Sequence, residues 1–468
     1  MNIGYHDAVI LLLILSLCIL PFIVLFVYAN RHKMLMEILP SIFWLFFMSL
    51  PFFFLSLSVQ SDVEYVQAFG VILVSGLTQL TDFISLRIHI KKARNLFLAV
   101  NGSRLKPFIR KFILFVILFL ILVVPILHIS ASHVFPLLEL LRNSDSSIDL
   151  PDARQAFTKG ANFGLFFHIL VTWFVPIFSV ISCFILYKLG FKKTIIFVMF
   201  LSCIYAVASL EKFQLLFLIF TFYISFRYLL NAEKNLLSGN KFVKIFITFC
   251  LVLNILGICM VIAGVSHRND TQVQNHISNH KTTGSFFTPS DYYRLGIVNN
   301  SFFPERIENF VYRTVLAPVD VSFRWYQYYS IRSENRNIRE FITNSEEPKA
   351  SNILANWYLV DRFPDKYRSY ANAYTSIDAD AYSVYGKFGI MFFVIILSFV
   401  RILAKLLSFK SSFSCFIYGM IVAHLSVLPM MAGIWSILFS RGVIILLFIS
   451  FVSCFSFYYL KNWNNPFQ

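Results

Sequence analysis

The sequence predicts an all-α polytopic membrane protein with about eleven transmembrane helices and one large, mainly helical loop outside the cytoplasm. The chain has 468 residues, of which 58% are hydrophobic and 14% are charged, whereas soluble domains carry about 25% charged residues. Apolar runs of about 20 residues, the length that crosses a bilayer, recur along the chain. Only residues 265–381 form a long polar stretch, which we place between the eighth and ninth spans.

The apolar runs divide the chain into three parts. We expect spans at about residues 7–29, 38–59, 64–86, 112–130, 163–187, 194–209, 213–230, 245–264, 382–400, 412–430 and 442–460. These give an N-terminal membrane domain (1–264), the polar loop (265–381) and a C-terminal membrane domain (382–468). Asp82, near the inner end of the third span, is interpreted as a capping or helix-bridging carboxylate.

The net charge of +16 is concentrated in short loops. The polar loop is neutral, because residues 265–380 contain thirteen Lys or Arg and thirteen Asp or Glu. Strongly basic loops alternate with acidic or neutral loops, which sets the orientation of the spans. We therefore predict a bacterial inner-membrane protein with a periplasmic N-terminus, a cytoplasmic C-terminus and a periplasmic polar loop. This distribution of charge argues against binding of nucleic acid.

The cysteines and the charges inside the spans exclude several classes. All seven cysteines fall in apolar runs, so no disulfide framework or Cys-based metal site is expected. The first span lacks the basic start and cleavage site of a signal peptide, so we interpret it as retained. Ionisable residues are nearly absent from the expected span interiors, which favours surface chemistry over ion-coupled transport.

Aromatic residues recur in the polar loop, where a helix is expected from Val319 to about Ser330, after the helix-breaking Pro318. Trp325, Tyr374 and Tyr385 are candidates for stacking on sugar rings. The alternative is a lid that rests on lipid headgroups, because such side chains also suit the membrane interface. The sequence does not decide between these two interpretations.

Basic side chains at the predicted outer face are candidates to bind phosphate. An arginine presents a planar fork of donors that matches phosphate oxygens. In the polar loop these are Arg268, Arg294, Arg306, Arg313, Arg324, Arg362 and Arg368, and at the outer ends of other spans they are Arg154, Lys212 and Arg441. The alternatives are ordinary ion pairing, as between Asp320 and Arg324, and snorkelling to headgroups.

The segment 374–389 leads into the ninth span and contains two carboxylates, Asp378 and Asp380. We place both at the outer surface, where one could accept a proton from a sugar hydroxyl; helix capping is the alternative. His267 is the other candidate base. Gly386 and Gly389 allow close approach by backbone or substrate. No metal or other cofactor is expected, and the phosphate-binding, hydrolase and zinc-protease motifs are absent from the sequence.

In this arrangement the chain resembles the Wzy-type O-antigen polymerases, which join oligosaccharide repeat units in bacterial envelopes. Two short segments, Tyr312–Pro318 and Asp380–Gly389, resemble the loop helix and the Tyr-Gly-x-x-Gly motif of that family. Some members carry paired Arg-x9/10-Gly motifs in two outer loops. Here only Arg154 and Gly164 have that spacing.

The resemblance implies a glycosyltransferase with a GT-C-like architecture that needs no metal. Its substrates would be oligosaccharides linked to undecaprenyl pyrophosphate in the membrane, and a chain-length regulator protein would be a possible partner. Arg313 and Arg324 would hold the leaving pyrophosphate, and a carboxylate or His267 would take the proton. An O-antigen ligase and a non-enzymatic flippase for lipid-linked oligosaccharides remain alternatives.

Overall fold

The structure of the chain is a computed structural model that describes residues 15–52, 62–92, 107–132, 173–208, 212–232, 317–331, 376–430 and 436–463, with isolated positions between them. Within these ranges the chain is helical and contains no strand. Six described stretches are long and apolar enough to cross a membrane. They are Leu35–Phe52, Tyr65–Ile90, Pro107–Ser132, Ile377–Ser408, Ser412–Met430 and Ile437–Cys454. The membrane class is thus confirmed, whereas the count of eleven spans stays a prediction.

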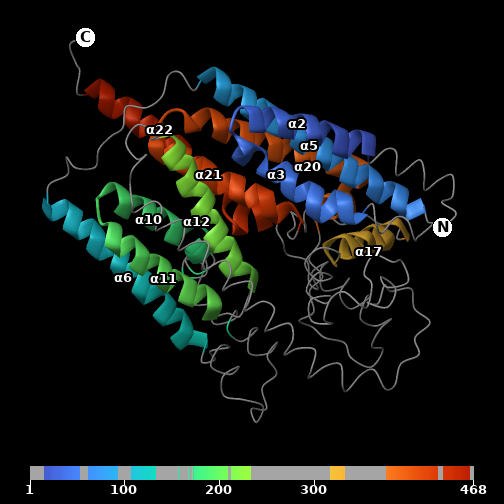
Figure 1. The fold of residues 1–468 in the computed structure, drawn as a ribbon. Coiled ribbons are helices and arrows are strands. Elements are labelled where there is room, and N and C mark those ends of the chain that lie inside the picture. Colours follow the sequence, from blue (N-terminus) through green and yellow to red (C-terminus); the bar gives the residue numbers. More distant parts are fainter. Residues whose placement is uncertain are drawn as a thin grey trace, which may run out of the picture. The chain divides into compact units, whose positions relative to one another are not determined.

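The chain forms two compact units (Figure 1). The first comprises Met1–Lys91, Val261–Ile402 and Leu425–Ile437, and the second comprises Lys92–Met260, Leu403–His424 and Leu438–Gln468. The first unit contains η1 (Leu15–Ile19), α2 (Leu20–Arg31), η2 (Leu35–Ile38), α3 (Leu39–Trp44), η3 (Leu45–Ser49), α5 (Asp62–Lys92), α17 (Ala317–Ile331), most of α20 (Ile377–Ser408) and η8 (Leu428–Met430). The second contains α6 (Pro107–Ser132), η6 (Phe174–Phe178), α10 (Ser179–Lys188), α11 (Lys192–Ala208), α12 (Lys212–Ala232), most of α21 (Ser412–Val427) and of η9 (Ser436–Ser440), and α22 (Val443–Trp463).

In the first unit, α2 and α5 pack through small and branched apolar side chains. Leu25 and Ala29 of α2 contact Ile38 and Leu86, which lie on η2 and α5. Trp44 donates a hydrogen bond to the carbonyl of Val71 across 3.2 Å. Because the indole of α3 bonds to an internal carbonyl of α5, these two helices are joined near the middle of α5.

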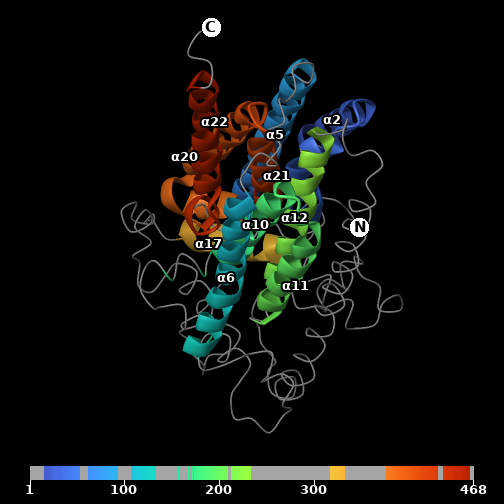
Figure 2. The same ribbon diagram turned by 90° about the vertical axis from the view of Figure 1, so that its left-hand side faces the viewer.

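In the second unit, α10 and α11 form a tight helical hairpin at Gly190. Gly190 has φ +83, and the amide of Phe191 donates to the carbonyl of Leu186 across 2.9 Å. A left-handed glycine with such backbone bonds ends a helix while satisfying its last carbonyls. Figure 2 shows α6 running beside α11, and Figure 1 shows the same.

Helix α20 is two arms joined by a sharp corner at Tyr385 and Gly386. Gly386 has φ 60 and ψ −143, outside the helical region. A side chain at Gly389 would collide with the backbone oxygen of Ala381, although eight residues of straight helix would separate them by about 12 Å. The first arm, Ile377–Val384, therefore folds back along the long arm, Lys387–Ser408. The predicted close approach of backbone at Gly389 is confirmed.

Most expected helices match the structure within a few residues, whereas the expected ninth span is too short at both ends. The spans expected at 194–209, 213–230 and 412–430 correspond to α11, α12 and α21 with η8, and α17 confirms the loop helix expected at 319–330. The ninth span, expected at 382–400, is instead α20, because the charged residues at its two ends are buried within the helix. The eighth span (245–264) lies outside the described residues.

Candidate functional site

The first candidate site lies where α17, the one described helix of the polar loop, meets the first arm of α20. Tyr326 of α17 donates a hydrogen bond to Asp378 Oδ2 across 3.0 Å. Ser376 donates to Asp378 Oδ1, and its hydroxyl lies 2.9 Å from that of Ser322 on α17. Two side chains of the loop helix thus share a hydrogen-bonded cluster with a carboxylate in the first turn of α20.

Asp378 and Asp380 are buried, so neither carboxylate is exposed at a surface, whereas their side of the membrane stays a prediction. Asp378 is 0% exposed and Asp380 is 5% exposed. Both stand in the first turn of α20, where acids favour the helix dipole, but Asp378 also faces inward. Its Oδ2 lies 3.1 Å from where a side chain at Gly70 of α5 would begin. The carboxylate is therefore enclosed by α5, α17 and α20.

Tyr326 is held as a hydrogen-bond donor. Burial first, and the Asp378 carboxylate second, raise the pKa of Tyr326 well above its ordinary value. The phenol therefore stays protonated in the physiological range and donates to the carboxylate. Its ring lies 4.8 Å from that of Tyr382 on the first arm. This contact joins the same two elements as the hydrogen bonds do.

The three aromatic residues predicted to stack on sugars differ in exposure. Trp325 is 3% exposed, so its ring belongs to the packed side of α17. Tyr385, at the corner of α20, is 46% exposed and open to a ligand or to lipid. Tyr374 lies outside the described residues. Of the three, Tyr385 is therefore the one whose ring is seen to be accessible.

The predicted gathering of basic side chains falls largely outside the described residues. Arg154, His267, Arg268, Arg294 and Arg313 lie there. For two more, Arg324 and Lys212, the structure describes the helices α17 and α12 but not the side chains. Arg441, half-buried in the turn before α22, is the one predicted phosphate ligand with a described side chain. A phosphate site built from these residues stays a prediction.

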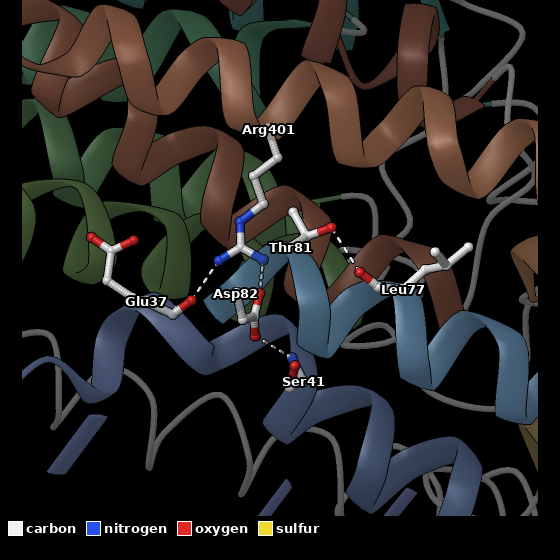
Figure 3. A network of polar contacts seen from close by, with 6 residues as sticks. All are labelled: Glu37, Ser41, Leu77, Thr81, Asp82 and Arg401. Carbon is white, nitrogen blue, oxygen red and sulfur yellow. Dashed lines mark hydrogen bonds and ion pairs between the residues drawn. The ribbon is translucent and has the colours of Figure 1, made fainter. Parts of the chain in front are cut away.

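A second candidate site lies inside the first unit, where Asp82 forms an ion pair with Arg401 (Figure 3). Asp82 Oδ2 also accepts a hydrogen bond from the backbone amide of Ser41 across 3.2 Å, and Arg401 donates to the carbonyl of Glu37. Both charged side chains are buried, with 0% and 3% of their surface exposed. The cluster thus joins η2, α3, α5 and α20.

This second site confirms one prediction and corrects another. Asp82 is a helix-bridging carboxylate, as its position in an apolar run predicted. Arg401, expected in a basic loop after the ninth span, instead lies in the long arm of α20 and is buried. Ionisable residues are therefore present inside the helical bundle. Their presence makes ion-coupled transport less strongly excluded than the sequence indicated.

A small cavity adjoins the ion pair. Its volume is about 40 Å³, which is room for roughly three water molecules. Arg401, Thr78, Thr81 and Ser398 supply its polar lining. Among the described residues, none accepts a hydrogen bond from Nε of Arg401. Because an unsatisfied buried donor is costly, we expect water in this cavity.

The second unit holds two buried basic side chains with evident partners. The ring of His128 lies 2.6 Å from the hydroxyl of Tyr205 and 2.9 Å from the carbonyl of Phe157. Because the carbonyl must accept, the other ring nitrogen accepts from Tyr205. The ammonium of Lys405 lies 4.6 Å from the ring centre of Tyr418. Both side chains are therefore satisfied within the helices.

In the part of the chain that the structure describes, no group of three or more His, Cys, Asp or Glu side chains could hold a metal ion. Comparison with known proteins adds no further constraint. No family model matches the chain, and no significant match exists among curated proteins or solved structures. The sequence and the two clusters above are therefore the basis for a functional proposal.

Proposed function

We propose that the protein polymerises lipid-linked oligosaccharide repeat units at the outer face of the bacterial inner membrane. A hydroxyl of the incoming unit attacks the anomeric carbon of the growing glycan. A new C–O bond forms with inversion, the bond to undecaprenyl pyrophosphate breaks, and the pyrophosphate leaves with the electron pair. The hydroxyl proton passes to a base on the protein.

The observation that carries this proposal is the anchoring of the polar loop on the membrane helices. The loop helix α17 is buried against α5 and α20 through Tyr326, Ser322 and Asp378. Polar chemistry is thereby attached to helices that are long and apolar enough to cross a membrane, which is what an enzyme acting on lipid-linked sugars requires. The exposed ring of Tyr385 lies on the same helix as Asp378 and suits a sugar face.

The roles that we assign to individual residues follow from the sequence. Arg313 and Arg324 would hold the departing pyrophosphate, helped by Arg268, Lys212 or Arg441, because fixed cationic groups stabilise a developing phosphate charge without a metal. His267 is the base that we propose. Asp378 is less suited to that role, because it is buried and already accepts two hydrogen bonds.

Deletion of the gene and analysis of surface-polysaccharide length test this function. A polymerase predicts that the deletion strain attaches single repeat units, whereas a ligase predicts that no glycan is attached. Arg313→Ala and Arg324→Ala should each shorten the ladder strongly, since loss of one donor to a developing charge costs about 100-fold in rate or more. Lys193→Ala, on an exposed residue at the predicted inner side, is the matched control. Full ladders from both arginine variants would contradict the assignment.

One observation favours a second candidate, transport of lipid-linked oligosaccharides. Charged residues buried in membrane helices are common in transporters, and Asp82 with Arg401 forms such a pair beside a polar cavity. A flippase predicts that the deletion strain keeps its lipid-linked units on the cytoplasmic leaflet. A polymerase predicts that they reach the outer leaflet and remain single.

A further inference from the structure

One face of α17 carries a series of polar contacts with the membrane helices of its unit. Val319, Ser322, Tyr326 and Ser330 follow spacings of three and four, so they form one stripe along the helix. The carbonyl of Val319 accepts from Gln67 of α5 across 3.1 Å. At the other end, the hydroxyls of Ser330 and Tyr382 lie 3.2 Å apart.

The centre of this stripe is the buried Asp378 carboxylate. It accepts hydrogen bonds from Tyr326 and Ser376, while Ser376 also contacts Ser322. Lifting α17 away would remove Tyr326 from the carboxylate and the carbonyl of Val319 from the amide of Gln67. Buried polar groups without partners are costly, and charged ones most of all. The contacts therefore form or break together.

Gly70 provides the space for this arrangement. A side chain at position 70 would overlap the hydroxyl of Tyr326. Gly76 lies six residues further along α5, and a side chain there would meet no atom within 4 Å. The glycine at position 70 thus permits the phenol to reach Asp378.

We propose that Asp378 is a positioning residue that clamps α17 onto α5 and the first arm of α20, and that α17 stays docked throughout the reaction cycle. Helix α17 is then a fixed platform rather than a lid that opens. The role of the clamp in turnover rests on the proposed function, but the docking itself does not. Asp378 acts on the chemistry through α17 and not by accepting the substrate proton.

A disulfide cross-link tests the docking without any measurement of activity. The hydroxyls of Ser322 and Ser376 are 2.9 Å apart, so Ser322→Cys with Ser376→Cys should bring two thiols to bonding distance. The pair should form a disulfide in membranes under mild oxidation, detected by the mobility of fragments after cleavage between the two positions. Ser330→Cys with Ser376→Cys is the matched control, because position 330 lies about 12 Å further along α17. No cross-link in the first pair would overturn the docking.

The cross-linked protein also distinguishes a platform from a lid. A fixed platform predicts polymerisation within about twofold of the reduced protein, measured on purified membranes with lipid-linked repeat units. Loss of activity on oxidation that is recovered by a reductant would mean that α17 must move, and would overturn this part of the proposal. If neither form polymerises, the proposed function fails while the cross-link still reports the docking.

Conservative substitutions separate a clamp from a base. Asp378→Asn keeps an oxygen that accepts from Tyr326, so polymerisation should fall less than about tenfold, whereas Asp378→Ala should lose both activity and protection of α17 from protease. Gly70→Ala should resemble Asp378→Ala, because the added methyl group overlaps the Tyr326 hydroxyl, whereas Gly76→Ala, which meets no neighbouring atom, should leave activity and protection unchanged. An inactive Asp378→Asn variant with normal protection of α17 would identify Asp378 as the base and overturn the clamp. Normal activity and normal protection of α17 in Gly70→Ala would also contradict it.

Discussion

The charges of Asp82 and Arg401 are tolerated inside the bundle because each neutralises the other. The remaining hydrogen bonds go to two backbone groups, the amide of Ser41 in the first turn of α3 and the carbonyl of Glu37 in η2. Ser41 lies in the first turn of α3, where backbone amides have no partner carbonyl within the helix. The carboxylate of Asp82 thus completes the start of α3, and the pair fixes three helices at one point.

Removing one partner should therefore destabilise the protein much more than removing both. Arg401→Ala leaves a buried carboxylate without its counter-charge, which costs about 3–5 kcal/mol. Asp82→Leu combined with Arg401→Met replaces the pair by apolar groups and should stay close to the wild type in stability. The measurement is the temperature at which half of the detergent-solubilised protein loses its single gel-filtration peak.

Equal thermal stability of Arg401→Ala and the wild type would contradict a structural role for the pair. A double variant that is as stable as the wild type but inactive would point instead to a functional role, as in the transport alternative. The same pair of variants thus separates the two interpretations of this buried charge.

At the scale of single residues, the sequence predicts the role that a side chain can play better than it predicts which groups surround that side chain. Asp82 stands alone in an apolar run, so its bridging role could be inferred, although its partner lies 319 residues further along the chain. Asp378 follows a polar segment, and the same acids near a helix start suit both a cap and a surface base. Its burial depends on Tyr326 and Gly70, which no local pattern connects to it.

At the scale of the element, the corner in α20 decides where the first candidate site lies. A continuous helix from Ile377 would carry Asp378 beyond the long arm. The turn at Gly386 instead brings the first arm back, so that Asp378 lies level with Gly70 of α5. The sequence does not predict the ends of α20. The acidic residues in its first turn and the basic residues near its end resemble loop sequence when their buried partners are unknown.

Gly389 should be intolerant of even the smallest side chain. In Gly389→Ala the added methyl group meets the backbone oxygen of Ala381, so the two arms must separate, at a cost of about 1–3 kcal/mol. Gly76→Ala is the matched control, because that position has open space and alanine favours a helix by about 1 kcal/mol. We expect a lower unfolding temperature for the first variant and an unchanged or higher one for the second. Similar behaviour of the two variants would argue against packed arms.

At the scale of the whole molecule, composition alone is enough to predict a helical membrane protein. The long apolar helices α5, α6 and α22 follow directly from runs of hydrophobic residues. Basic residues such as Arg87 and Arg110, expected in loops, continue α5 and α6 as helix, because a helix end that leaves the apolar region needs no break in its backbone bonds. Hydropathy therefore locates the apolar core of a span more accurately than the ends of its helix.

The orientation of the chain is the prediction on which the proposed chemistry depends. Basic loops are retained in the cytoplasm, and the segments around Lys193 and Lys241 are basic, whereas the polar loop is neutral. A cysteine introduced at Asn337 in that loop should react with a membrane-impermeant thiol reagent added to the periplasmic side. A cysteine introduced in place of Lys193, an exposed residue in the first turn of α11, should react only after the inner membrane is permeabilised.

The native cysteines should add little background, because those that the structure describes are buried or half-buried. The unsubstituted protein nevertheless serves as the blank for each labelling reaction. The opposite pattern, with position 193 labelled in intact cells and position 337 protected, would place the polar loop in the cytoplasm. Undecaprenyl pyrophosphate glycans are polymerised on the other side of the membrane, so that result would exclude the proposed function whatever the state of the α17 clamp.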